Sequence, residues 1–393
     1  MKVAYIVTRA DSFGGAQAHV LDLAQALRAG GGEPVVLVGG DGPFAAELRR
    51  RHVPCIEIRH LVRPVHPVRD ALAFLEILVA LRRIAPDLVC AHTAKAGLLG
   101  RVAGATLRIP TIFTPHGWAI ADRISSRQGR VFRYLERFAG LFTTRIINVC
   151  EYERDLALRC RVTAARKLAM VYNGMPDIPP ALRGNAGAHP PRLVMVARME
   201  QPKDHATLLH ALAGLKSLPW RFDLVGDGPL EPTVRKLVQW FGLDDRVRLL
   251  GFRRDVTELI AGSQVFVLSS RSEAFPYSIL EAMRAALPVV ATDVGGIREA
   301  VIPEETGLLS PPGDPDALQS NLRRIVNDPE ARRRMGEAGR RRYLSHFTFE
   351  KMQANTFALY WEVLSTTAAC HARTASDPRP LPEVRAGSWR PFL

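Results

Sequence analysis

The sequence predicts an α/β protein made of two doubly wound domains, each built on a parallel sheet. Short apolar runs that suit buried strands alternate with longer segments of helical periodicity along most of the chain. The length of 393 residues is enough for two or three domains. A stretch at 176–191 is rich in proline, glycine and alanine and has the composition of a linker between two domains.

The first domain is expected at 1–175 and opens with a strand at 3–7. Gly14 and Gly15 come next, before a helix at about 16–29. Two glycines let the backbone approach a ligand closely, although the Gly-x-Gly-x-x-Gly fingerprint is absent and a plain turn also explains the pair. Further strands are expected at 35–38, 55–58, 87–90, 111–113 and 146–149, the last closing the sheet, and helices at 44–51, 67–84, 98–103 and 132–144.

Polar side chains follow two of these strands. His92 and Lys95 come after the strand at 87–90, and His116 lies in a Pro-His-Gly turn after the strand at 111–113. Ligands bind beyond the carboxyl ends of parallel strands, so both loops are candidate sites. Judged by its spacing alone, a histidine in such a turn is more often an ordinary loop residue.

The helix at 132–144 has arginines interleaved with large apolar residues. An amphipathic helix that faces the core is the simpler interpretation. The alternative is a patch that binds a membrane surface.

The second domain is expected at 192–349 and starts with a strand at 192–196. Arg198 and Lys203 follow that strand. A guanidinium and an ammonium five residues apart can bind separate oxygens of a diphosphate, and ordinary surface charge is the alternative. Later strands are expected at 222–225, ending at Gly226, at 247–250, ending at Gly251 and Phe252, and at 265–268 and 289–292, and helices at 317–326, 329–343 and 349–366.

Two carboxylates follow the strand at 265–268. Glu273 precedes Phe275 and Pro276, and Glu281 lies on the helix expected after this proline. The N-terminus of a helix favours anionic or hydroxyl-rich ligands, and carboxylates can accept hydrogen bonds from vicinal hydroxyls of a sugar or a ribose. A capping Glu273 and a solvated Glu281 are the alternative, and the spacing alone does not separate the two interpretations.

This Glu-x7-Glu motif, with Phe-Pro inside it, resembles that of the retaining GT-B glycosyltransferases of family 4. The order of the other motifs agrees with the family over about residues 1–365, although Ala197 and Asp204 stand where the family has glycine. A His-Thr-x-Lys-x-Gly run at 92–97, with His-Gly at 116–117, resembles in particular the members that build bacterial exopolysaccharide, capsule or O-antigen.

The resemblance implies a GT-B fold, in which two Rossmann-like domains face a cleft and a C-terminal helix, here at 350–370, crosses back to the first domain. The acceptor is expected on the first domain and the donor on the second. The family's first glutamate contacts the donor sugar and its second grips the ribose, which implies these roles for Glu273 and Glu281. Catalytic roles are also implied for His116 at the donor sugar and for Arg198 and Lys203 at the leaving diphosphate. Donor contacts are further implied for Gly14, Gly15, Gly226, Gly251, Phe252, Phe275 and Pro276, and acceptor contacts are expected of His92 and Lys95.

The function expected from this resemblance is a hexosyltransferase. It would move a hexosyl unit with retention from a nucleotide sugar, UDP-linked, to a hydroxyl of a lipid-linked or polysaccharide-precursor acceptor. No cofactor is expected besides the donor, and no metal, because no Asp-x-Asp site stands in a suitable context. The alternatives are a nucleotide-sugar epimerase of the same fold, which needs no acceptor, and an inactive partner subunit.

The net charge of +14 points to anionic partners. It suggests peripheral contact with an anionic membrane, at the inner face of the cytoplasmic membrane, whereas a nucleic-acid partner lacks any readout motif. The five cysteines form no CxxC pair, which fits a reducing cytoplasm. The N-terminal apolar run is too short for a signal peptide. The tail at 374–393 is rich in proline and arginine and is expected to be disordered.

Overall fold

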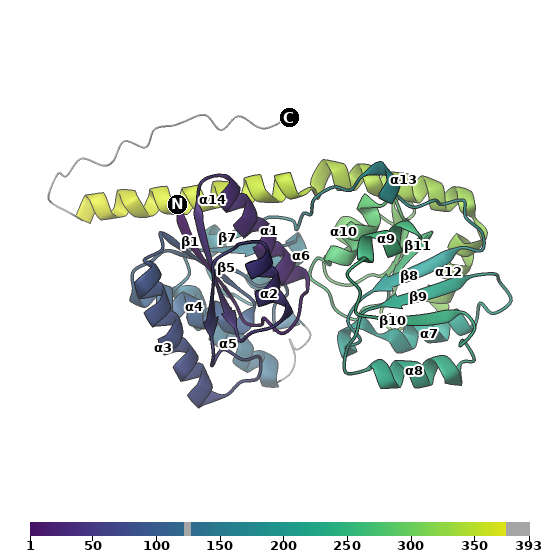
Figure 1. Ribbon diagram of the computed structural model, residues 1–393, viewed down its shortest axis with the longest axis horizontal. Helices are drawn as coiled ribbons and strands as arrows, with labels where there is room; N and C mark the ends of the chain where they lie inside the picture. The colour runs from purple at the N-terminus through teal and green to yellow at the C-terminus, as the bar shows by residue number, and fades with distance from the viewer. Residues whose placement is uncertain (122–126, 375–393) are drawn as a thin grey trace.

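The computed structural model describes residues 1–121 and 127–374. Within these ranges the chain forms two α/β lobes, each built on one parallel sheet (Figure 1), and this confirms the predicted fold class. The first sheet has the strand order β3-β2-β1-β4-β5-β6-β7, and the second has the order β10-β9-β8-β11-β12-β13. The strands are β1 (Lys2–Val7), β2 (Glu33–Gly39), β3 (Cys55–Ile58), β4 (Leu88–His92), β5 (Thr111–Thr114), β6 (Arg145–Asn148), β7 (Leu168–Met170), β8 (Arg192–Val196), β9 (Arg221–Val225), β10 (Val247–Gly251), β11 (Val265–Leu268), β12 (Val289–Thr292) and β13 (Gly307–Ser310).

Helices connect these strands and cover both faces of each sheet. Those of the first lobe are α1 (Gly15–Ala29), α2 (Pro43–Arg50), α3 (Pro67–Ile84), α4 (Ala94–Thr106), α5 (Arg127–Leu141) and α6 (Glu151–Arg159). Those of the second lobe are α7 (His205–Ala213), α8 (Glu231–Trp240), α9 (Val256–Ala261), α10 (Tyr277–Arg284), α11 (Ile297–Ala300), α12 (Pro315–Asn327) and α13 (Pro329–His346), and α14 (Phe349–Thr374) follows.

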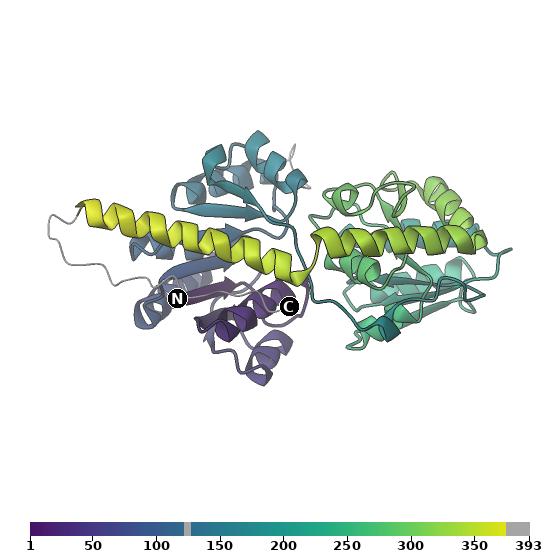
Figure 2. The ribbon, with the colours of Figure 1, turned by 90° about the horizontal axis from the view of Figure 1, so that it is seen from above.

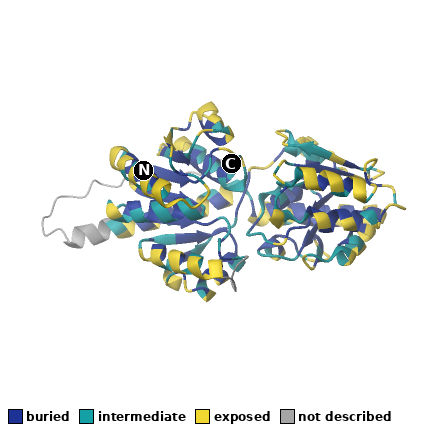
Figure 3. Cartoon of the chain, turned by 90° about the horizontal axis from the view of Figure 1, so that it is seen from below, coloured by how far each residue is buried: buried dark blue, intermediate teal, exposed yellow. Residues whose placement is uncertain are grey.

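The central strands are apolar throughout because both of their faces are buried. All five residues at 3–7 in β1 are fully buried. Val3, Tyr5 and Val7 pack with α1, α2 and α14, and the residues between them pack with α3 and α4 on the opposite face. Figure 3 shows the buried strands inside the first lobe and the exposed outer surfaces of its helices. A strand that is buried on both faces has a continuous apolar sequence, and this is why β1 was predicted correctly.

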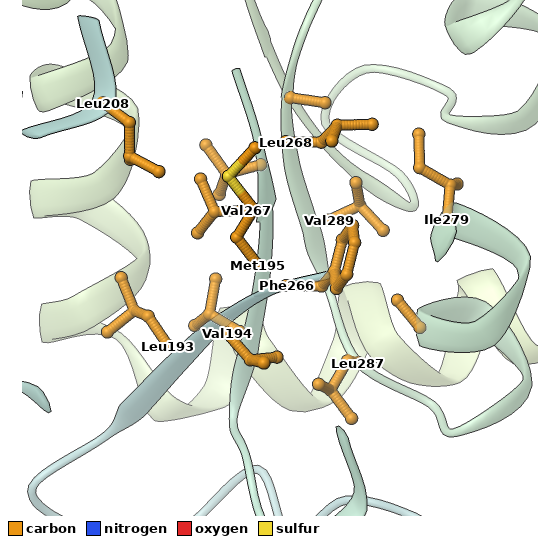
Figure 4. Packing of buried hydrophobic residues seen from close by; sticks show 14 of the residues in the cluster. Leu193, Val194, Met195, Leu208, Phe266, Val267, Leu268, Ile279, Leu287 and Val289 are labelled. Atoms are coloured by element: carbon orange, nitrogen blue, oxygen red, sulfur yellow. The ribbon is translucent and has the colours of Figure 1, made fainter. Parts of the chain in front are cut away.

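The second lobe has a core of the same kind. Met195 of β8 and Phe266 of β11 are fully buried and belong to one cluster with Ile279 of α10 (Figure 4). This packing fixes the start of α10 against the sheet, and so it also fixes the loop that joins β11 to α10.

In each sheet the order of successive strands reverses direction next to the first strand, and this position is called a topological switch point. β1 pairs with β2 on one side and with β4 on the other, and β8 pairs with β9 and β11 in the same way. Ligands of open α/β sheets bind at such points, beyond the carboxyl ends of the two strands. The loops after β1, β4, β8 and β11 are therefore the candidate ligand-binding positions.

The C-terminal helix α14 joins the two lobes. It continues from α13 of the second lobe and runs along the first lobe (Figure 2). Met352, Tyr360 and Val363 on this helix are buried in the core of the first lobe. This is the crossing helix that the resemblance implied.

The first sheet does not end where the sequence predicted. The segment at 146–149 was expected to close the sheet, but α6 and β7 follow, and β7 pairs with β6 at the edge. The prediction was wrong because Leu168–Met170 is a strand of only three residues and shows no periodicity.

The predicted core-facing orientation of the helix at 132–144 holds for Phe132, which packs against the core of the first lobe, but it was wrong for Leu135 and Phe138. In α5, Leu135 is 41% exposed and Phe138 is 51% exposed, so these large residues do not face the core. Small residues do so instead, because the helix lies very close to its neighbours. A Cβ atom on Gly140, for example, would lie 2.4 Å from the carbonyl oxygen of Val162. The buried residues of α5 are Gly129, Glu136, Ala139 and Gly140.

Candidate active site

Glu273 lies in the loop after β11, at the carboxyl edge of the second sheet. Its Oε1 atom forms an ion pair with Nζ of Lys203 and accepts a hydrogen bond of 2.6 Å from the Ser270 hydroxyl. Lys203 comes from the loop after β8, the strand beside β11. The switch point therefore brings these two predicted residues into direct contact. Oε2 of Glu273 makes no hydrogen bond to the described residues and can accept one from a ligand.

Arg198 follows β8 and lies near the first lobe. Nη2 of its guanidinium is 2.9 Å from Oε1 of Glu200, and that oxygen is 4.0 Å from Nη1 of Arg63 in the first lobe. Nε of Arg198 is buried and has no partner in the part of the chain that the structure describes. A buried N–H without a partner is rare and is available to an anionic ligand.

Glu281 lies on α10, one helical turn after Tyr277. Burial raises the pKa of its carboxyl group, and the nearby Arg284 opposes that rise. The carboxyl group of Glu281 makes no hydrogen bond to the described residues, and only its backbone carbonyl accepts one, from the amide of Ala285. Because an unpaired buried carboxylate is costly, hydroxyl donors from a ligand would stabilise it.

Glycines shape the neighbouring loops of the second lobe. Gly226 has a φ of 135°, and a Cβ atom there would lie 2.1 Å from the carbonyl oxygen of Ala197. Only glycine therefore fits where this loop crosses the loop that leads to Arg198. Gly251 has a φ of 64°, and the next residue, Phe252, is 55% exposed, so its ring is available for stacking.

The carboxyl edges of the two sheets contact each other. A Cβ atom on Gly15 would lie 2.8 Å from Cδ2 of Tyr277, and one on Gly117 would lie 3.7 Å from Cβ of Ala274. Gly14 and Gly15, at the start of α1, thus lie against the start of α10. The Tyr277 hydroxyl is 3.1 Å from Nδ1 of His19 in α1. The starts of α1 and α10, which hold predicted residues of the two lobes, therefore lie side by side.

Three histidines of the first lobe meet beside this contact. They are His19 of α1, His92 at the end of β4 and His116 after β5. Nδ1 of His92 is 3.0 Å from Nε2 of His116, and the His19 ring meets the His116 ring edge-on with 4.7 Å between their centroids. His116 has a φ of 54°, which turns its side chain out of the strand direction.

Burial controls the charge of the three rings. It lowers the pKa of His19 to about 4, against the opposing effect of Asn173. Burial also holds the pKa values of His92 and His116 well below the ordinary value, and the neighbouring histidines lower them further. All three imidazoles are therefore neutral at neutral pH.

Family models match both lobes. The model described as Glycosyltransferase Family 4 matches residues 13–177, and the model described as Glycosyl transferases group 1 matches residues 183–342. The chain belongs to the family 4 glycosyltransferases. The predicted family and the prediction of an enzyme are thereby confirmed for this glycosyltransferase.

Relatives and solved structures agree with this result. The glycosyltransferase is 27% identical over 286 residues to the UDP-Gal:alpha-D-GlcNAc-diphosphoundecaprenol alpha-1,3-galactosyltransferase of Escherichia coli. This match covers 68% of this chain and 73% of the relative. The glycosyltransferase is 31% identical over 319 residues to an exopolysaccharide phosphotransferase of Streptomyces coelicolor, which covers 80% of this chain but 32% of that protein. Its fold matches HepE of Anabaena in complex with UDP and glucose with a TM-score of 0.79, at 22% identity over 92% of this chain and 99% of that one.

The two predicted acceptor residues have other partners in this glycosyltransferase. Nζ of Lys95 is 2.6 Å from Oδ1 of Asp70 and also donates to the carbonyl of Pro64. An acceptor phosphate would have to displace this carboxylate. His92 is 1% exposed and contacts His116, so its position supports that ring rather than a direct acceptor contact.

Phe275 fixes the loop of Glu273 through both its ring and its backbone. Its ring is buried against Tyr172 and Phe347, and its carbonyl accepts a hydrogen bond of 2.9 Å from Asn173. Pro276 comes next and forms the N-cap of α10. These contacts hold the loop that carries Glu273.

Sequence reasoning missed three residues that contact the predicted ones in the candidate site: His19, Ser270 and Tyr277. His19 was detectable as a polar residue on the otherwise apolar face of the first helix, four positions after Gly15. Ser270 and Tyr277 lie inside the motif that contains both glutamates and carried no separate signal.

The described helices of the glycosyltransferase include none that is both long enough and apolar enough to span a bilayer. Cys55, Cys90, Cys150 and Cys160 are free thiols. The predicted disordered tail lies outside the described residues, except for its first residue, Thr374, which ends α14.

Proposed function

We propose that this glycosyltransferase moves a hexosyl unit from a UDP-sugar to a hydroxyl of a lipid-linked or polysaccharide-precursor acceptor, with retention at the anomeric carbon. The observation that carries the proposal is the proximity of Gly117 to Ala274, since a Cβ atom on Gly117 would lie 3.7 Å from Cβ of Ala274. It places the loop of His116 against the loop of Glu273, so that one ligand could touch both.

The donor nucleotide would bind mainly to the second lobe. Arg198, with its unused Nε, and Lys203 would stabilise the negative charge that develops on the leaving diphosphate. Positioned cations are a large electrostatic contribution in such reactions. We expect the transfer to need no metal, because these two cations supply the charge that a metal would otherwise provide.

The two glutamates would bind different parts of the donor. Glu281, whose partly buried carboxyl group has no hydrogen-bond partner among the described residues, would accept hydrogen bonds from the ribose hydroxyls. Glu273 would orient the hexose through Oε2 while Lys203 and Ser270 hold Oε1. His116 would reach the same sugar from the first lobe, and Phe252 would lie against the base.

The names of two relatives support the choice of substrates. The Escherichia coli relative is named for a UDP-galactose donor and a diphosphoundecaprenol-linked acceptor, and the HepE structure contains UDP and glucose. A lipid-linked acceptor also agrees with the net charge of +14.

A transfer assay tests the proposal. UDP-sugars would first be ranked by thermal shift, since a ligand at about a hundred times its Kd adds about 2.7 kcal/mol of stability. The best donors would then be incubated with diphospholipid-linked sugars, and the linkage formed would be determined by NMR. The expected product has the anomeric configuration of the donor. An inverted product, or conversion of the UDP-sugar without an acceptor, would contradict the proposal, and the latter would indicate an epimerase.

We propose that the enzyme binds an anionic membrane surface through α5 and meets its lipid-linked acceptor there. Five large apolar residues on this helix are between 41% and 73% exposed, and arginines are interleaved with them. Apolar contact combined with basic charge is the pattern of interfacial helices. The exposed apolar residues are Val131, Tyr134, Leu135, Phe138 and Leu141.

Vesicle flotation tests this contact. The protein should float with anionic vesicles at low salt, and less with zwitterionic ones. The double variant Phe138→Asp/Leu141→Asp should lose this binding, whereas Trp240→Asp, at an 83% exposed site on the second lobe, should keep it. Equal flotation of both variants would show that α5 is not the contact.

A further inference from the structure

His19, His92 and His116 offer one ring nitrogen each within 4.8 Å of one another. They come from a helix, a strand end and a turn, so the cluster is formed by the tertiary fold of the first lobe. His19 and His92 are at least 95% buried, and His116 is partly accessible, which leaves a path for an ion to enter.

We propose that these three histidines form a binding site for a divalent transition-metal ion, and that zinc is the ion they suit best. Three neutral imidazoles with an open fourth position are a recognised donor set for zinc, whereas calcium and magnesium prefer oxygen ligands. The reaction itself is not proposed to use this ion.

The geometry requires only a small adjustment. Zn–N bonds of about 2.0–2.1 Å in a tetrahedral site place the nitrogen atoms about 3.4 Å apart. The His92 and His116 nitrogens are already 3.0 Å apart, and no pair in the cluster exceeds 4.8 Å. Side-chain rotations that move a ring by about an ångström would therefore complete the site.

The surroundings of the rings support binding. The Tyr277 hydroxyl hydrogen-bonds to Nδ1 of His19, and second-shell contacts of this kind fix the orientation of a ligand ring. Binding would replace one hydrogen bond between two imidazoles with coordinate bonds.

The consequence for activity rests on the proposed function. If His116 contacts the donor sugar, an ion bound to its ring withdraws that ring from the sugar and occupies the adjacent space. Bound zinc would then inhibit transfer, and a chelator would restore it.

Direct binding tests the proposal without any activity measurement. Untagged full-length protein would be titrated with Zn²⁺ in competition with a chromophoric chelator, and with Co²⁺ while its visible spectrum is recorded. We expect one tight equivalent of zinc and the intense absorption of tetrahedral cobalt. His19→Gln, His92→Gln and His116→Gln should each weaken zinc binding at least about tenfold, while His210→Gln, at an exposed histidine of the second lobe, should not.

A second variant separates a built site from a chance cluster. Tyr277→Phe removes the hydroxyl that orients His19 and should weaken zinc binding about tenfold. Circular dichroism and the metal-free Tm would show that each variant is folded. Zinc affinities equal to wild type in the three histidine variants, or an octahedral cobalt spectrum, would overturn the proposal. This binding result decides the proposal whether or not sugar transfer is detected.

Discussion

Lys203 and Glu273 form an ion pair at the carboxyl edge of the second sheet, although 70 positions separate them in the sequence. The Lys203 side chain is 24% exposed and that of Glu273 is 10% exposed, so both are partly shielded from water. A lysine in this position can orient Glu273 in the free enzyme and also face the diphosphate of a bound donor.

The first prediction concerns Lys203→Ala. This variant removes a cation from the proposed diphosphate site and leaves Glu273 with Ser270 alone. We expect kcat/KM for the donor to fall about 100- to 1,000-fold, as when one positioned donor is removed from a charged transition state. The control is Lys236→Ala, at an exposed lysine of the same lobe, which should keep wild-type kinetics. A Lys203→Ala enzyme with kcat/KM close to wild type would exclude this role.

The second prediction concerns pH and Glu281. Burial raises the pKa of this carboxyl group, and only its ionised form accepts hydrogen bonds from both ribose hydroxyls. UDP affinity should therefore fall as the pH is lowered through the raised pKa of this carboxyl group. Calorimetric titration with UDP measures this dependence.

The Glu281→Gln variant is the matched test of that pH effect. It should bind UDP more weakly at high pH and lose the glutamate-dependent part of the pH profile. Glu258→Gln, at an exposed glutamate on α9, should retain the wild-type profile. If Glu281→Gln has the same profile as wild type, another group causes the pH dependence.

The third prediction concerns the stability contributed by Asp22 on α1. Burial raises the pKa of Asp22 from 3.8 to about 6, and Arg51 and Arg284 only partly oppose this. The folded state thus binds this proton more tightly than the unfolded state, so this group adds stability as the pH falls from about 6 to about 4. Above pH 6 its charged form instead costs roughly 1–3 kcal/mol.

Replacing this carboxylate should therefore stabilise the protein at high pH. Asp22→Asn is expected to raise the Tm at about pH 8, and the gain should shrink as the pH falls below the raised pKa. Asp255→Asn is the control, because Arg253 lowers the pKa of that carboxyl group. A gain for Asp22→Asn that stays constant with pH would rule out the titration of this group as the cause.

The fourth prediction concerns the buried ion pair between α4 and α5. Nη2 of Arg101 is 2.6 Å from Oε2 of Glu136, and the Arg101 side chain is 0% exposed and lies over the ring of Phe113. Removing one member leaves an uncompensated buried charge. Glu136→Ala should lower the free energy of unfolding by about 3–5 kcal/mol in urea titration.

An apolar replacement of both members should recover much of that loss, because the buried charges are removed together. The double variant Arg101→Met/Glu136→Leu tests this, and Glu330→Ala, which removes an exposed partner of Arg333, should change stability little. If Glu136→Ala is as stable as wild type, the pair does not hold α5 in place.

Much of the donor side of the site could be predicted from the sequence. Arg198, Lys203 and Glu273 each follow a short apolar run, and apolar runs of this kind mark strands whose carboxyl ends hold ligands. Their roles remain predictions, but their common location follows from the order of the strands. His19 and Tyr277 could not be predicted in this way, because each lies within a helix and meets its partner across the two lobes.

The sequence by itself determined the alternation of strands and helices, the division into two lobes and the loops in which chemistry could occur. These features depend on local periodicity and on residues that start or end an element. Only the tertiary structure decided that Lys203 pairs with Glu273, that three histidines meet, and that α5 turns its large apolar residues outward. Those relationships depend on contacts between segments far apart in the chain. The packing of the whole fold determines these contacts, and local sequence patterns contain no information about that packing.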